Sequence, residues 1–376
     1  MQEKIVFINQ DSGYLMVDII NAHIAAGFSC VLITGRLVER NTKLHPSVKV
    51  CKIIKYNRET TFNRLLTWVI GYFQIWINVV IRFRKDTLFI VSNPPFAPLL
   101  PLTVKNPYKL LIFDIYPDAL SELGYLSDNS IIIKLWRKSN KSVFAKAISI
   151  YTLTDGMRLL LEQYAGDKPI EVVPLWTDNS FLKPVNPDKN PFIEKHNLSG
   201  KFIVMYSGNL GLSSNVEILL DIAARTISKN LTFIIIGNGA RKEKLVEKAI
   251  DLNLQNVIFL PWQPVDELPY SLASANLALV FLGSNASRLA VPSKLYDILS
   301  VGVPLLCVTT KDSAVEKLVA KYDCGKSFNP DDLNGMINYI HELSENNQLC
   351  VSMSENSAKA SKNFNFINAT NFLDKK

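Results

Sequence analysis

Cysteine and histidine are scarce in this sequence, which has five cysteines and four histidines in 376 residues. The cysteines lie far apart and never form a Cys-x-x-Cys pair, which argues against a disulfide framework and a zinc site. No histidine lies in a pattern with serine, aspartate or cysteine partners. The sequence therefore supports neither a hydrolase triad nor a metal cluster, and we expect no metal and no tightly bound cofactor.

Internal repeats, low-complexity tracts and a leader sequence are also missing. Residues 1–9 lead directly into a strand-like apolar run without the regions of a signal peptide, so we expect a cytoplasmic protein. The formal net charge of +7 permits a phosphorylated substrate, an anionic membrane or a nucleic acid as partner. Because no nucleic-acid-binding module is present, nucleic acid is the least favoured of these.

Short apolar runs alternate with helical patterns along the whole chain. Continuous apolar strands separated by helices are typical of parallel sheets covered on both faces. We expect strands at residues 5–8, 31–33, 88–91, 110–113, 149–153, 171–173, 202–206, 232–236, 257–260, 277–281 and 304–308. This rhythm predicts an α/β protein with two Rossmann-like, doubly wound parallel sheets.

The chain is longer than one hydrophobic core usually serves, so two domains are expected. Residues 181–200 interrupt the alternation with three prolines and mixed charge, as an interdomain linker does. We predict a first domain at residues 1–180, a second at residues 201–360, and a tail at residues 361–376 that returns to the first domain.

Two predicted helices bear on membrane contact. Residues 65–81 carry no charge, but small and polar residues recur at spacings of three and four, which favours a buried or membrane-apposed helix over a membrane span. Residues 131–147 place basic side chains on one face, which indicates either a solvated face or contact with an anionic membrane. The basic residues are Lys134, Arg137, Lys138 and Lys141.

Two segments follow strand ends, where ligands bind in open parallel sheets. Residues 207–211, Ser-Gly-Asn-Leu-Gly, can bring backbone amides and a helix N-terminus to a phosphate, or can simply form a turn. Residues 291–297 place Lys294 and Asp297 in the first turns of a helix. The lysine can neutralise a leaving diphosphate and the acid can bind a ribose diol; the alternative is ordinary capping of the helix.

Six segments together resemble the retaining family-4 glycosyltransferases of the GT-B fold, especially bacterial O-antigen, capsule and other polysaccharide sugar transferases. They are residues 114–118, 173–178, 206–211, 236–239, 292–294 and 302–304. The resemblance implies two Rossmann-like domains that face a central cleft. The first would bind the acceptor and the second the nucleotide sugar.

The resemblance also implies roles for individual residues. Lys294 would act on the departing diphosphate and Asp114 would orient the acceptor hydroxyl, although an acid after a strand can also cap a helix. The implied donor-binding residues are Gly208, Asn209, Gly211, Pro261, Trp262, Ser293, Lys294 and Asp297. The implied acceptor-binding residues are Ser12, Gly13, Tyr14 and Tyr116. Residues 237–239 are expected to form a turn, with Arg241 and Lys242 as further candidates for phosphate contact.

The sequence departs from the family pattern in two places. Leu289 occupies the position of the first acid of the E-x7-E motif, of which Asp297 is the second, and residues 215–220 lack the usual Arg/Lys pair. Asn285, Arg288 and backbone amides are the expected substitutes. These departures leave the fold prediction intact but weaken the assignment of the site.

The resemblance implies metal-free transfer with retention at the anomeric carbon. A UDP-sugar is favoured over a GDP-sugar as donor, and a polyprenyl-diphosphate-linked glycan at the inner face of a bacterial plasma membrane is the expected acceptor. Two alternatives remain open: a sugar-nucleotide epimerase on the same fold, and an inactive glycosyltransferase-like assembly partner.

Overall fold

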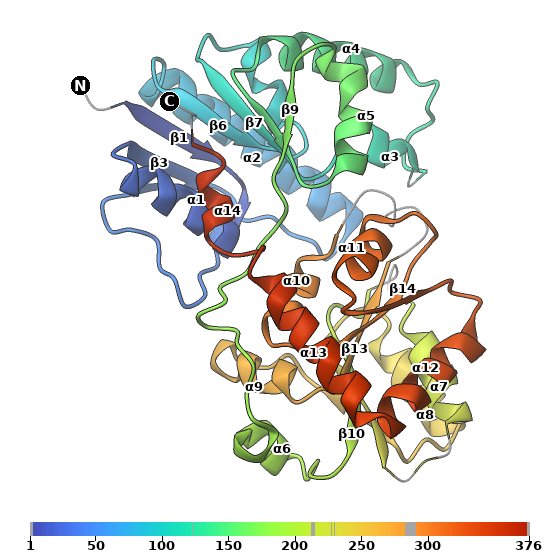
Figure 1. The fold of residues 1–376 in the computed structure, drawn as a ribbon. Coiled ribbons are helices and arrows are strands. Elements are labelled where there is room, and N and C mark those ends of the chain that lie inside the picture. Colours follow the sequence, from blue (N-terminus) through green and yellow to red (C-terminus); the bar gives the residue numbers. More distant parts are fainter. Residues whose placement is uncertain are drawn as a thin grey trace. The chain divides into compact units, whose positions relative to one another are not determined.

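The computed structural model describes residues 3–122, 124–211, 215–226, 228, 230–282 and 291–373. The chain divides into two compact units, Met1–Leu175 with Phe366–Lys376, and Trp176–Asn365. Each unit has a parallel sheet with helices on both faces (Figure 1). The predicted α/β class with two Rossmann-like sheets is confirmed.

The first sheet has the strand order β5-β3-β1-β6-β7-β8-β9, which is the doubly wound order with its switch point between β1 and β6. The inner strands β1, β6 and β7 are mostly apolar and are buried except for Lys4 at the start of β1, because helices cover both faces. A parallel pair, β2 (Asp11–Ser12) and β4 (Arg36–Leu37), extends from its carboxyl edge. The other strands are β1 (Lys4–Ile8), β3 (Ser29–Thr34), β5 (Lys49–Lys52), β6 (Thr87–Val91), β7 (Tyr108–Ile112), β8 (Ile150–Thr152) and β9 (Ile170–Val172). The helices are α1 (Tyr14–Ala25), α2 (Thr61–Arg82), η1 (Ala97–Leu102), α3 (Asp118–Glu122), α4 (Ile131–Lys146), α5 (Asp155–Ala165) and α14 (Ile367–Thr370).

The second sheet has the order β12-β11-β10-β13-β14-β15, with its switch point between β10 and β13. Its strands are β10 (Phe202–Ser207), β11 (Leu231–Ile236), β12 (Val257–Leu260), β13 (Leu277–Phe281), β14 (Leu305–Val308) and β15 (Gly325–Phe328). Its helices are η2 (Pro187–Lys189), α6 (Pro191–Lys195), α7 (Glu217–Arg225), α8 (Lys242–Asp251), η3 (Val265–Glu267), α9 (Leu268–Ala273), α10 (Ser293–Ser300), α11 (Ala314–Tyr322), α12 (Leu333–Glu345) and α13 (Asn347–Ser361).

The segment expected as a linker, residues 181–200, lies inside the second unit. Leu182 and Phe192 are buried, and the Asn190 side chain donates a hydrogen bond of 2.9 Å to the Tyr270 carbonyl. The prolines therefore shape two short helices that pack on the domain rather than a free linker.

The last residues pack in the first unit. Helix α14 lies against α1. The buried ring of Phe372 contacts Phe89 and Tyr151, with centroids 5.9 and 4.9 Å apart. This apolar contact ties the end of the chain to the first sheet.

Helix α2 buries part of its small and polar stripe together with Trp68, Ile75 and Val79, and it exposes a row of other large apolar side chains. Thr67 and Gly71 are buried, and the Gln74 side chain accepts a hydrogen bond of 2.7 Å from the Ile54 amide. The exposed apolar side chains, called the α2 stripe below, are Phe62, Leu65, Leu66, Val69, Phe73, Ile77 and Ile81. By length and composition α2 is the one helix in the described chain that could cross a bilayer.

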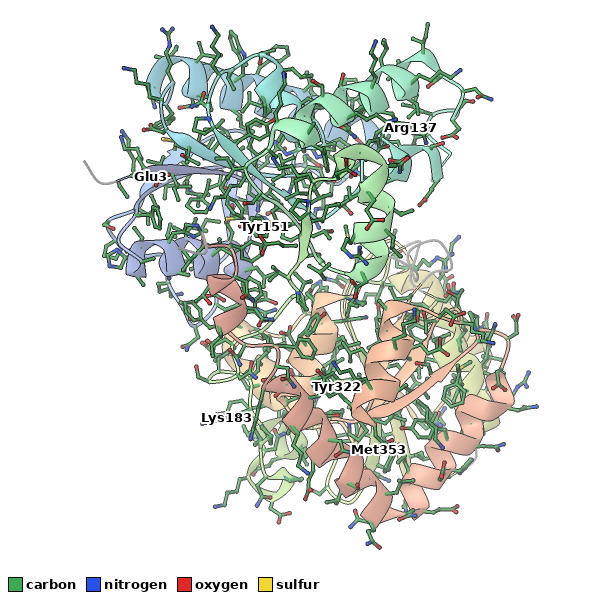
Figure 2. The ribbon with its side chains drawn as sticks, turned by 45° about the horizontal axis from the view of Figure 1, so that its top comes forward. Glu3, Arg137, Tyr151, Lys183, Tyr322 and Met353 are labelled. Atoms are coloured by element: carbon green, nitrogen blue, oxygen red, sulfur yellow. The ribbon has the colours of Figure 1, made fainter. Side chains whose placement is uncertain are left out.

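Helix α4 presents three of its four predicted basic residues to solvent: Lys134, Lys138 and Lys141. The fourth, Arg137, labelled in Figure 2, forms ion pairs of 2.9 Å with Asp118 and 2.6 Å with Asp128. Arg137 therefore stabilises the first unit instead of adding to an open cationic face.

Candidate active site

The loops after β10 and β11 pack directly against each other at the carboxyl edge of the second sheet. The amides of Gly208 and Leu210 donate hydrogen bonds of 3.0 and 2.9 Å to the carbonyls of Ile236 and Asn238. Gly237 has φ of +149°, and a Cβ there would lie 2.0 Å from the Gly208 carbonyl oxygen. This position therefore requires glycine.

The packing of these loops changes the predicted role of the glycine turn. Because two of its amides, at Gly208 and Leu210, already have acceptors, they are not available to a phosphate. Asn209 is exposed, and within the described residues its backbone N–H has no hydrogen-bond acceptor. The absent side chain at Gly208 matters instead, since a Cβ would lie 2.9 Å from Lys294 Nζ.

Lys294 lies beside this turn. Its Nζ is 4.0 Å from the centroid of the Tyr206 ring, and the Tyr206 hydroxyl donates a hydrogen bond of 2.9 Å to the Asn209 carbonyl. Burial lowers the pKa of Lys294 from 10.5 to about 7, against a smaller opposing effect of Cys307. A cation–π contact holds the ammonium group, and within the described residues no carboxylate forms an ion pair with it.

Helix α10 begins at the same place. Pro292 caps it without a side-chain hydrogen bond, and Ser293 is exposed in the first turn. Within the described residues, the amides of Ser293 and Lys294 have no acceptor. The positive end of the helix dipole and these amides make this N-terminus suitable for a phosphate.

Asp297, the predicted ribose contact, is 5% exposed. Its Oδ1 accepts a hydrogen bond of 2.6 Å from the Thr177 hydroxyl. The acid therefore ties α10 to the start of the second unit, a contact that the sequence did not reveal. Its predicted role in ribose binding stays a prediction.

Two other predicted donor contacts, Trp262 and Arg241, differ in how free their side chains are to bind a ligand. Trp262, which follows β12 and Pro261, is 51% exposed and can stack on a nucleobase. Arg241 is paired with Glu217 at 2.8 Å, so it is less suited to phosphate binding than the sequence suggested. The expected substitutes Asn285 and Arg288, and Leu289 itself, lie outside the described residues.

In the first unit, Asp114 follows β7. Its amide and that of Phe113 both donate to the Ser92 hydroxyl, at 3.1 and 2.9 Å, which fixes the start of the loop. Within the described residues its exposed carboxylate has no hydrogen bond or ion pair. Surrounding protein raises the pKa of Asp114 by desolvation, and Arg58 partly opposes this.

Tyr116 and the loop after β1 give the predicted acceptor side. The Tyr116 ring lies between the rings of Trp68 and Trp136, both at 6.3 Å. The Ser12 hydroxyl is fully buried, 3.1 Å from the Asn9 carbonyl and 3.0 Å from the Thr34 hydroxyl. We therefore assign Ser12 a positioning role in place of direct contact with the acceptor.

The two residues after Ser12 are partly exposed. A Cβ at Gly13 would meet no atom within 4 Å, which leaves space in front of the N-terminus of α1. The Arg40 guanidinium lies 3.9 Å from the centroid of the Tyr14 ring. Tyr14 thus presents a ring partly covered by a cation.

Two residues near this loop, Arg36 and Arg58, were not predicted, whereas Asp11 belongs to the predicted acceptor-side loop. Asp11 binds the guanidinium groups of Arg36 and Arg58, with contacts of 2.6 and 2.9 Å. Arg36 and Arg58 follow Asp11 by 25 and 47 positions in the sequence. Only the adjacency of β1, β3 and β5 in the sheet brings them together, so sequence spacing carries no signal of the cluster.

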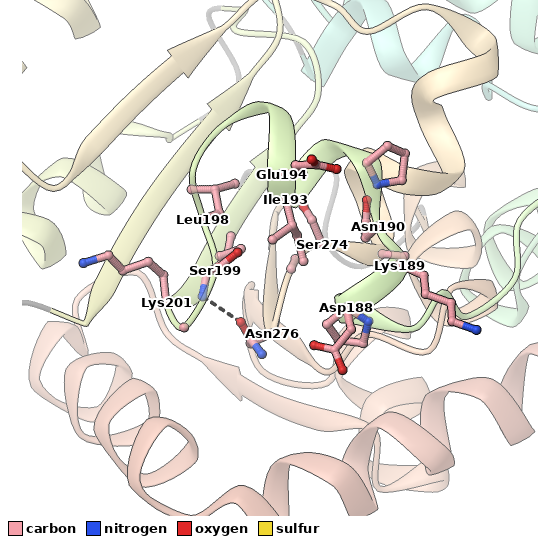
Figure 3. A pocket seen from close by; sticks show the side chains of 16 residues that line it. Asp188, Lys189, Asn190, Ile193, Glu194, Leu198, Ser199, Lys201, Ser274 and Asn276 are labelled. Atoms are coloured by element: carbon pink, nitrogen blue, oxygen red, sulfur yellow. Dashed lines mark hydrogen bonds between the residues drawn. The ribbon is translucent and has the colours of Figure 1, made fainter.

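A groove of about 570 Å³ lies at the other edge of the second sheet (Figure 3). It is lined by residues that precede β10 and β13, and the Asn276 side chain accepts a hydrogen bond of 2.8 Å from the Ile203 amide there. None of the predicted donor residues lines it. In open parallel sheets ligands bind at the carboxyl edge, so this groove is not the candidate site.

Known proteins that resemble the chain are glycosyltransferases. Residues 188–360 match the family described as glycosyl transferases group 1. The chain is 24% identical over 300 residues to the probable glycosyltransferase WbjE of Pseudomonas aeruginosa, covering 78% of this chain and 75% of that one. It is 37% identical over 102 residues to the putative colanic acid biosynthesis glycosyl transferase WcaI of Escherichia coli K12, covering 27% and 25%.

Solved structures with the same fold cover nearly the whole chain. Sucrose-phosphate synthase from Thermosynechococcus elongatus superposes with a TM-score of 0.75 at 13% identity, covering 98% of this chain and 96% of that one. Anabaena HepE in complex with UDP-glucose superposes with a TM-score of 0.70 at 15% sequence identity, covering 98% of this chain and 97% of that one. At these identities the likeness shows the fold. Residues 188–360, most of the second unit, are therefore similar to the glycosyl transferases group 1 family, and the chain has the GT-B fold.

Proposed function

We propose that the protein is a retaining glycosyltransferase that moves a sugar from a UDP-sugar to a lipid-linked glycan in bacterial surface polysaccharide biosynthesis. The observation that carries the proposal is the meeting of Lys294 with the N-terminus of α10 and the turn at Gly208, within residues similar to the glycosyl transferases group 1 family. This arrangement can bind a diphosphate and stabilise the negative charge that develops on it as the sugar leaves.

The remaining parts of the proposal concern the two substrates. Trp262 stacks on the uracil, and UDP is favoured because HepE is known in complex with UDP-glucose. Asp114 accepts the hydrogen bond that orients the acceptor hydroxyl. Lys294 and helix amides take the place of a metal at the diphosphate. A polysaccharide pathway is supported by the name of the relative WcaI.

The protein acts as a cytoplasmic enzyme bound peripherally to the plasma membrane. The α2 stripe supplies apolar contact, and the exposed α4 lysines, which contribute about 1 kcal/mol each near an anionic surface, supply attraction to lipid headgroups. Sedimentation with liposomes tests this part. Recovery that is equal with and without anionic lipid, and equal to recovery without liposomes, would contradict it.

Incubation with a panel of nucleotide sugars and a polyprenyl-diphosphate-linked glycan tests the reaction. We expect one UDP-sugar to be consumed with formation of a lipid-linked product whose anomeric configuration, measured by NMR, equals that of the donor. An epimerised donor without transfer would identify an epimerase, and no change with any donor would favour an inactive assembly partner.

A further inference from the structure

The carboxyl edge of the first sheet carries a cationic groove that none of the predicted roles uses. It has a volume of about 730 Å³ and is lined by Arg36, Lys55, Tyr56 and Arg58 together with uncharged residues and Glu59. The Gln10 side chain, which follows β1, donates hydrogen bonds of 3.2 and 2.8 Å to the carbonyls of Ile54 and Thr67, two residues that line the groove. Ligands of open parallel sheets bind beyond the carboxyl ends of the strands.

A single carboxylate holds both arginines in place. Asp11 accepts two hydrogen bonds from Arg36, of 2.6 and 2.8 Å, and one of 2.9 Å from Arg58. The Asp11 side chain is 7% exposed, whereas those of Arg36 and Arg58 are 52% and 67% exposed. Each guanidinium has five N–H donors, so both keep donors for a ligand. Their planar geometry suits bidentate binding of phosphate oxygens.

The charge around the groove is positive. The cations of Arg36, Lys55 and Arg58 face the carboxylates of Asp11 and Glu59, which leaves a net charge of about +1. Lys55 is exposed. The guanidinium of Arg64 donates a hydrogen bond of 3.2 Å to the Tyr56 hydroxyl at the wall of the groove.

The apolar α2 stripe begins on the same turns of α2 as the groove residue Thr67, on the outward face of the helix. Thr67 lines the groove from the second turn of α2, and Phe62, Leu65 and Leu66 are exposed on the same turns. The stripe continues at spacings of three and four to Ile81, over a helix of about 33 Å. The first turns of α2 therefore carry both a wall residue of the cationic groove and the start of an apolar surface long enough for a hydrocarbon chain.

We propose that Arg36, Lys55 and Arg58 bind the phosphate groups of a lipid-linked acceptor whose hydrocarbon chain leaves along the α2 stripe into the membrane. This inference rests on the proposed function, because it names the part of the acceptor that the first unit recognises. The groove residue Tyr56 stacks on Trp68 at 5.4 Å, and Trp68 lies 6.3 Å from Tyr116, two residues after the acid proposed to orient the acceptor hydroxyl. The ligand chemistry is a phosphate or diphosphate joined to an isoprenoid.

Calorimetric titration of the full chain with farnesyl diphosphate tests the proposal. We expect Arg58→Gln to weaken binding about tenfold to a hundredfold, and Lys55→Gln, which removes an exposed charge and preserves the fold, about two- to fivefold. Arg225→Gln removes an equal charge from exposed Arg225 in the second unit and should change nothing. Inorganic pyrophosphate should compete with farnesyl diphosphate, whereas farnesol should compete far less.

The outcomes separate this inference from the proposed function. Unchanged farnesyl diphosphate affinity in both groove variants, no binding by the wild type, or competition by farnesol alone would overturn the groove assignment. Loss of UDP-glucose affinity in the same variants would also overturn it, since the groove would then hold the donor. Sugar transfer to a phosphate-free acceptor would survive in each of these cases if the proposed function is correct.

Discussion

The pKa of Lys294 makes donor binding depend on pH in a way that can be worked out. The free protein carries a charged lysine below about pH 7 and a neutral one above it. A bound diphosphate stabilises the charged form, so binding above pH 7 must take up a proton. The Kd for UDP-glucose should therefore be lowest near pH 6 and rise about 30-fold by pH 8.5, because affinity falls tenfold for each pH unit above the pKa.

Isothermal titration at pH 8 in two buffers of different ionisation enthalpy measures this proton uptake. We expect about 0.9 protons per UDP-glucose bound, given a pKa of about 7. Lys294→Arg is the matched control, because arginine stays charged and its Kd should be flat over this range. Lys294→Met should weaken binding by about 1.5–3 kcal/mol. A flat Kd and no proton uptake in the wild type would refute the placement of the diphosphate at Lys294.

Three further changes test other parts of the account. Asp114→Asn should lower the rate of transfer about a hundredfold without changing UDP-glucose affinity, and unaltered turnover would remove its role. Gly237→Ala should lower the free energy of unfolding, measured by urea denaturation, by about 2–4 kcal/mol, because its Cβ would meet the Gly208 carbonyl. Gly13→Ala, where a Cβ meets open space, is the control, and an equal loss of unfolding free energy in both variants would argue against this explanation. Trp262→Ala should weaken UDP-glucose binding by about 1–3 kcal/mol, with farnesyl diphosphate affinity as the control, and no weakening would exclude stacking.

The central strands could be predicted because their burial on both faces makes them continuous apolar runs, as in β6 and β13. Strands β5 and β15 were missed, and both lie at a sheet edge. Their sequences, Lys-Val-Cys-Lys and Gly-Lys-Ser-Phe, are partly exposed and therefore lack that signal. Residues 181–200 were expected as a linker because composition alone does not show that Phe192 is buried and that Asn190 bonds to Tyr270 in the second unit.

The parts of the site whose residues are close in the sequence could be predicted. The parts whose residues come from distant segments of the chain could not. Residues 291–297 lie on one helix as expected, and Lys294 reaches the glycine turn. The burial of Asp297 against Thr177 and the cluster of Asp11 with Arg36 and Arg58 depend on contacts between distant segments. The polar stripe of α2 was recognised, but only the structure shows that part of it is buried.

The position of UDP-glucose in crystals of the full-length protein tests the central claim most directly. The account predicts diphosphate density beside Lys294 and the amides that begin α10, with the uracil near Trp262. Density for UDP-glucose in the cationic groove at Arg36 and Arg58, or in the groove lined by residues that precede β10 and β13, would contradict it. The absence of UDP-glucose density from the second unit would contradict it as well.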